Sequence, residues 1–226
     1  MAATATGTDQ IVDVGLGGGP RPKNGNGFRR NGGHDGDDSP LRFSPARYRI
    51  GVWVAIGSIL MLFVALTSAY IVRSASASDW RPVAMPKVLW LSTALILISS
   101  LTIEVSRRSL KQQQDRGYSR WLVLTTVLGL SFLASQLMAW RQLVRQGVYL
   151  ASNPYNSFFY LFTAAHGLHL LGGILALSYL LLTTRAKRAT LEGELRRVGA
   201  ADAVTIYWHF MDFLWIGLFG LLMFWK

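Results

Sequence analysis

The sequence predicts an all-α membrane protein, a polytopic bundle of five transmembrane helices with its N-terminus in the cytoplasm and its C-terminus outside. Three observations predict this fold. Hydrophobic residues make up 51% of the 226 residues and charged residues only 15%, against roughly 25% charged residues in soluble domains. Five apolar segments are long enough to cross a bilayer. The Lys and Arg residues gather on alternate connections between these segments.

An N-terminal tail precedes the membrane part. Residues 1–47 contain ten Gly and four Pro and almost no large apolar residue. Such a composition cannot bury enough apolar surface to offset the conformational entropy lost on ordering. We therefore expect a disordered cytoplasmic tail over residues 1–47 and one five-helix transmembrane domain over residues 48–226.

The apolar segments follow the tail in order. A helix rises ~1.5 Å per residue, so ~20 residues cross the ~30 Å hydrocarbon core of a bilayer. The strict alternation of a membrane β-strand is absent, so a β-barrel is not expected. Small residues recur within the segments, which allows neighbouring helices to approach closely. The predicted segments are Ile50–Val72, Val88–Ser106, Trp121–Trp140, Phe158–Thr183 and Val204–Trp225.

The distribution of basic residues predicts the orientation. Residues 1–49, before the first apolar segment, and the second and fourth loops together hold 17 Lys and Arg, whereas the other two loops and the C-terminus hold six. Because positive charge stays on the cytoplasmic side, the N-terminus is expected inside. The net charge of +11 lies between the apolar runs rather than on one helix face, so no nucleic-acid partner is expected. The chain has no Cys, which excludes disulfides and thiolate-bound metals.

Ionisable side chains at membrane depth are costly and are therefore functional candidates. Counting along each predicted helix places four of the five candidates in the cytoplasmic half of the membrane. We expect Glu104, His169, His209 and Asp212 to form a hydrogen-bonded network. Trp208 and nearby basic residues would hold a lipid headgroup at its edge. The five candidates are Glu104, His166, His169, His209 and Asp212.

Other interpretations of these residues remain open at this point. His169 and His209 lie on different helices, so they could be axial ligands of a haem in a stand-alone b-type cytochrome. His166 and His169 share a helix face, which suits a metal better than a haem, although the carboxylate pattern of a di-iron bundle is missing. A small transporter would show internal repeats and broken helices, which the sequence lacks. We assign no catalytic residue and no metal site.

Three stretches carry specific motifs. An aromatic run over Phe158–Phe162 leads into His-Gly-Leu-His at positions 166–169, and Tyr-Trp-His-Phe-Met-Asp-Phe-Leu-Trp spans positions 207–215. Leu89–Thr93 and Ser99–Glu104 form a third stretch. Together they resemble subunit III of the haem-copper terminal oxidases, in its short five-helix bacterial form. The residues that carry the resemblance most specifically are His166, Gly167, Tyr207 and Trp215, and Gly129, Phe132 and Gln136 also fit.

The resemblance implies an accessory, non-catalytic subunit of a proton-pumping cytochrome c or quinol oxidase in the bacterial inner membrane. Such subunits carry no haem or copper, which lie in subunits I and II. They support subunit I, bind structural phospholipid and help proton uptake. The partners would be subunits I and II and membrane lipids. A companion subunit of a nitric-oxide reductase is the alternative. One position departs from the family pattern, because Lys87 stands where many members carry a carboxylate.

The uneven split of basic residues leads to a prediction about topology. A reporter enzyme that is active only in the periplasm should be active when fused after Lys226 and inactive when inserted at Arg116. Measuring reporter activity in whole cells checks both positions. The reverse pattern would contradict the orientation.

Overall fold

The computed structural model describes residues 45–76, 87–150, 153–184 and 191–225. All of the regular secondary structure in these ranges is helical, which confirms the predicted all-α class. Five helices in the described ranges are long and apolar enough to cross a membrane. The predicted tail, residues 1–47, lies outside the described residues except where the first helix begins. The helices are α1 (Pro45–Ser76), α2 (Val88–Lys111), α3 (Asp115–Arg145), α4 (Pro154–Thr184) and α5 (Leu191–Phe224).

The helices are longer than the apolar segments that predicted them. α2 continues to Lys111 and α3 begins at Asp115, so the predicted second loop is mostly helical. α5 begins at Leu191 rather than near Val204, because the stretch between them is rich in Leu, Glu, Arg and Ala, which favour helix. The apolar pattern reports only the part of each helix that lies in hydrocarbon. The polar ends of the helices extend beyond it.

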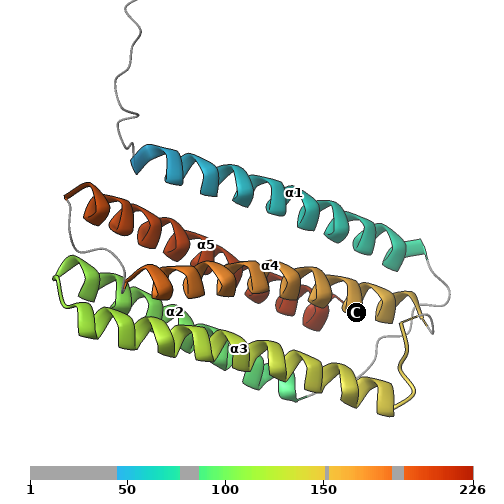
Figure 1. Ribbon diagram of the computed structural model, residues 1–226. Coiled ribbons are helices and arrows are strands. Elements are labelled where there is room, and N and C mark those ends of the chain that lie inside the picture. Colours follow the sequence, from blue (N-terminus) through green and yellow to red (C-terminus); the bar gives the residue numbers. More distant parts are fainter. Residues whose placement is uncertain (1–44, 77–86, 151–152, 185–190, 226) are drawn as a thin grey trace, which may run out of the picture. The chain divides into compact units, whose positions relative to one another are not determined.

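Four of the helices form a closed ring. α2 packs against α3, α3 against α4, α4 against α5, and α5 against α2. α1 lies outside this ring and packs against α5 and α4, as Figure 1 shows. Within the described residues, α1 and α2 do not approach each other closely. The fold is therefore a four-helix bundle with one peripheral helix.

Hydroxyl and indole groups connect the neighbouring helices. Ser92 and Ser135 are hydrogen-bonded between α2 and α3 at 2.7 Å, and Trp140 donates to the Thr163 hydroxyl between α3 and α4 at 3.1 Å. The Tyr70 hydroxyl of α1 donates to the backbone carbonyl that follows α5, at 2.6 Å. Lipid chains are as apolar as the side chains, so the hydrophobic effect gives little driving force for association between membrane helices. Close packing and such interhelical hydrogen bonds, at about 0.6 kcal/mol each, hold the helices together.

Large aromatic rings fill the centre of the bundle. Trp208 and Trp215 of α5 and Phe132 of α3 are almost completely buried. The Phe132 and Trp215 rings meet edge to face, with 4.9 Å between their centroids. The bulk of Trp208 is accommodated by Gly129, where a Cβ atom would lie only 2.8 Å from the indole Cη2. A small residue at position 129 is therefore required for α3 and α5 to keep this distance.

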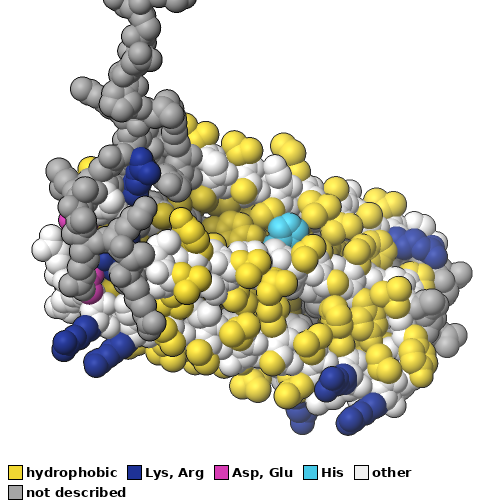
Figure 2. Space-filling view, viewed as in Figure 1, with side chains coloured by type: hydrophobic (Ala, Val, Ile, Leu, Met, Phe, Trp, Pro, Cys, Tyr) yellow, Lys and Arg dark blue, Asp and Glu magenta, His cyan; other side chains and the backbone are white. Residues whose placement is uncertain are grey.

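The surface has the distribution expected of a membrane-spanning bundle. Figure 2 shows hydrophobic side chains over the middle of one face and Lys and Arg side chains at its two ends. The most exposed large apolar side chains include Met61, Leu101, Leu182 and Phe213. An apolar belt between basic ends matches a hydrocarbon layer between two aqueous interfaces.

The contact at Gly129 predicts a specific cost of substitution. Gly129→Ala should lower the free energy of unfolding by about 1–3 kcal/mol, because the added methyl group overpacks the site against Trp208. Thermal unfolding of the purified chain in one fixed detergent measures this. Gly172→Ala on α4 is the matched control, because its Cβ atom would meet nothing within 4 Å. Equal stability of the two variants would contradict the proposed packing constraint.

Candidate functional site

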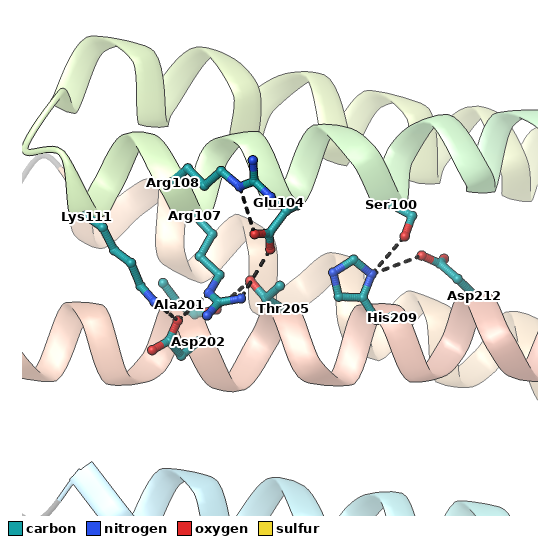
Figure 3. A network of polar contacts seen from close by, with 10 residues as sticks. All are labelled: Ser100, Glu104, Arg107, Arg108, Lys111, Ala201, Asp202, Thr205, His209 and Asp212. Carbon is teal, nitrogen blue, oxygen red and sulfur yellow. Dashed lines mark hydrogen bonds and ion pairs between the residues drawn. The ribbon is translucent and has the colours of Figure 1, made fainter.

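A cluster of charged side chains joins the C-terminal end of α2 to the N-terminal part of α5, as Figure 3 shows. Arg107 donates from Nε to Asp202 Oδ1 at 2.7 Å and from Nη1 to Glu104 Oε2 at 3.2 Å. Arg108 donates to the other Glu104 oxygen at 3.1 Å, and Lys111 Nζ lies 3.7 Å from Asp202. All of these side chains are partly exposed. The cluster holds three positive and two negative charges.

A second polar group lies further along the same α2–α5 contact. The Ser100 hydroxyl and His209 Nδ1 are hydrogen-bonded at 2.8 Å, and the same nitrogen lies 3.9 Å from Asp212 Oδ2. Figure 3 shows the three side chains pointing toward one another. The Asp212 side chain is only 5% exposed, whereas that of His209 is 42% exposed. Neither carboxylate oxygen of Asp212 accepts a hydrogen bond from the described residues.

Trp208 lies on the inner side of α5, in the core. Its indole Nε1 donates to the Ser99 hydroxyl of α2 at 3.0 Å, and the side chain is fully buried. The neighbouring His209 points instead to the α2 edge of α5. Trp208 therefore contributes to packing between α2, α3 and α5, and it is not at the surface where we had expected it to meet a headgroup.

His169 has different neighbours from the rest of the predicted network. Its Nδ1 lies 2.7 Å from the carbonyl oxygen of Ala165, one turn earlier on α4. The ring packs edge to face on Phe63 of α1, with 5.8 Å between centroids. The Tyr207 hydroxyl donates to the His169 carbonyl at 2.9 Å. The structure thus brings His209 and Asp212 together, gives Glu104 separate basic partners, and places His169 at the contact of α4 with α1 and α5.

The remaining motif residues build the centre of the bundle. His166 is fully buried, with its ring 5.7 Å from the Phe132 ring and 5.2 Å from the Trp215 ring between centroids. Neither ring nitrogen is hydrogen-bonded to the described residues. A Cβ atom at Gly167 would be 3.7 Å from Leu133, an ordinary contact. His166 therefore acts in packing through its ring, whereas the surroundings of Gly167 would accept a Cβ atom.

Several residues of this site were not predicted from the sequence. Arg107 and Asp202 were assigned to loops, because only the apolar part of each helix was recognised. Ser99 and Ser100 are common residues that carry no signal of their own. A second ion pair joins Arg197 Nη1 to Asp115 Oδ1 at 2.9 Å. The spacing of Glu104 from Arg107 and Arg108, at three and four residues, was the available signal for a charged helix face.

The arrangement is suited to joining helices and to holding polar groups in an apolar surrounding. Within the part of the chain that the structure describes, no three His, Cys, Asp or Glu side chains converge on one point. The ionic cluster offers cationic groups at one end of the bundle. The group of Ser100, His209 and Asp212 offers an imidazole at the bundle surface backed by a buried carboxylate.

Comparison with known proteins identifies the family. The family model described as cytochrome c oxidase subunit III matches residues 39–226, which confirms the resemblance seen in the motifs. The probable cytochrome c oxidase subunit 3 of Nocardia farcinica is 34% identical over 184 residues, covering 80% of this chain and 89% of the relative.

Two further relatives show how wide the similarity is. The probable cytochrome c oxidase subunit 3 of Mycobacterium tuberculosis is 32% identical, with the same coverage of 80% and 89%. The quinol oxidase subunit 3 of Bacillus subtilis is 24% identical over 192 residues, covering 82% of this chain and 92% of the relative. The chain therefore belongs to the cytochrome c oxidase subunit III family, and it is a multi-pass membrane subunit of a haem-copper oxidase complex.

Proposed function

We propose that this chain is an accessory, non-redox subunit of a bacterial inner-membrane oxidase that stabilises subunit I, binds structural phospholipid and supports proton uptake. The observation that carries the proposal is that its ionisable side chains form ion pairs between its own helices. Arg107 and Asp202 join α2 to α5, and Arg197 and Asp115 join α5 to α3. These groups stabilise a bundle, and the reaction itself would take place in the partner subunits.

The charged end of α2 supports the proposed binding of phospholipid. The Arg108 side chain is 72% exposed and that of Lys111 is 47% exposed. Exposed Leu101 and Val105 lie on the same helix, one to two turns away. Long basic side chains beside an apolar surface extend toward the membrane interface, where they can meet a lipid phosphate. An anionic headgroup would complement the excess positive charge of the cluster.

The same cluster supports the proposed role in proton uptake. The distribution of basic residues predicts that this end of the bundle faces the cytoplasm, the side from which such oxidases take up protons. Charges at a surface change the local potential and the rate at which ions are captured there. Removing the subunit would remove both its basic side chains and its carboxylates from the neighbourhood of subunit I.

A stand-alone b-type cytochrome using His169 and His209 is less well supported. The His169 ring packs on Phe63 of α1, whereas His209 is hydrogen-bonded to Ser100 of α2. Because α1 and α2 do not approach each other closely in the described residues, the two rings do not face a common site. The family match covers the whole membrane part of the chain. Relatives named for cytochrome c oxidase and for quinol oxidase both occur, so the proposal leaves both electron donors open.

Removal of the subunit tests the proposal. An oxidase prepared without this chain should keep its haem and copper content. Its turnover should fall more steeply toward high pH than that of the intact enzyme, because proton supply becomes limiting when protons are scarce. Its working life should also be shorter. Haem spectra and oxygen uptake, measured against pH and time with and without the chain, check these outcomes.

His169→Ala and His209→Ala provide the control for the accessory role. Neither substitution should change the haem spectrum of the intact oxidase. Loss of a haem signal in either variant would show that the chain carries haem. In the removal experiment, identical pH profiles and lifetimes of the oxidase with and without the chain would rule out the role in proton supply.

A further inference from the structure

Among the described residues, no helix covers the face of α5 that carries His209. We define the α5 glycine face as His209, Phe213, Gly217 and Gly220, which follow one another at spacings of four, four and three residues. Such spacings place side chains on one side of a helix. Phe213 is 76% exposed, and a Cβ atom at Gly217 or Gly220 would meet nothing within 4 Å.

Gly217 and Gly220 leave this face without side chains at two positions, so the backbone of another helix can approach it closely. Small residues three or four apart allow transmembrane helices to pack at short distance. α1 and α2 both pack on α5 but do not approach each other closely, and Figure 3 shows them on opposite sides of α5. A helix from outside the chain can therefore reach α5 along this face.

His209 makes the face unsuitable for lipid alone. Its side chain is 42% exposed, and Nδ1 is used by Ser100 at 2.8 Å with the buried Asp212 carboxylate behind it at 3.9 Å. The remaining nitrogen, Nε2, is left for a group outside the chain. A polar group that faces hydrocarbon without a hydrogen bond is costly, and an acyl chain offers no acceptor.

The depth of His209 also argues against a lipid headgroup. His209 lies seven positions after Asp202 of the ionic cluster on α5. At ~1.5 Å per residue this is a distance of about 10 Å along the helix. The open glycines lie further from the cluster, past the midpoint of the predicted span. A headgroup bound at the ionic cluster therefore does not reach His209, whereas a side chain on a membrane-spanning helix does.

We infer that the α5 glycine face is the docking site for a transmembrane helix of another oxidase subunit, which brings a polar side chain as hydrogen-bond partner to Nε2 of His209. This rests on the proposed function, because the partner is a subunit of the same complex. The exposed face of α4 provides a contrast. It carries Leu161, Leu168, Leu175, Leu182, the exposed Tyr179 and an open Gly172 but no His, Lys, Arg, Asp or Glu, and it is suited to lipid.

Paired glycine variants test the docking in the assembled oxidase. Gly217→Leu fills the docking face, and Gly172→Leu fills the α4 face. Neither position has an atom near the added Cβ, so both variants should keep the fold of the chain. After detergent extraction, the amount of Gly217→Leu chain retained per haem should fall at least about fivefold, and that of Gly172→Leu should match the wild type. Equal retention of the two variants would overturn the inference.

Photo-crosslinking distinguishes a helix from a lipid. A benzophenone-bearing phenylalanine replaces Phe213 in one preparation and Leu168 in another. Irradiation of the intact oxidase should join the chain to a second subunit from position 213 and only to lipid from position 168. Lipid adducts alone at position 213 would overturn the inference and leave the proposed accessory function standing. Failure of the wild-type chain to co-purify with haem-containing subunits would instead contradict the proposed function itself.

Discussion

A polar side chain within hydrocarbon needs a partner, because no water is available to replace one. In this chain many Ser and Thr hydroxyls meet the requirement on their own helix, by donating to a carbonyl three or four residues earlier. A second set of side chains meets it between helices. Hydroxyl and indole groups connect the neighbouring helices, as in the bonds of Ser92 with Ser135 and of Trp208 with Ser99. Charged groups gather at the helix ends, where Arg107 reaches Asp202. Helix register therefore depends on these few directional contacts.

Packing at the bundle centre depends on shape as much as on polarity. The Trp208 indole can sit between α2 and α3 only because Gly129 leaves space for it. His166 contributes as a flat ring between Phe132 and Trp215. Trp208 and His166 thus contribute here to the packing of helices against one another. His209, at the edge of the bundle, differs because its ring is partly exposed.

The sequence predicted the membrane-spanning part of each helix well, and it predicted the polar extensions of the helices and the contacts between helices less well. Hydropathy predicted five helices, and the motifs predicted the family. The contacts of His209 with Ser100 and of His169 with Phe63 could not be predicted, because each depends on which helices are neighbours and on how they are rotated. Asp202 was missed for another reason, since it lies on a polar extension of α5 that the apolar pattern does not reveal.

The peripheral position of α1 has a consequence for the order in which the protein is built. α2 and α3 follow each other directly and can pair as soon as both have been synthesised. α1 must wait, because its contacts are with α4 and α5, and the Tyr70 hydroxyl bonds to the carbonyl of Trp225, which directly follows α5. Although α1 precedes these helices in the chain, it is therefore fixed in place only after they have been made. Until α4 and α5 have been synthesised, only lipid or another protein can shield its inward side.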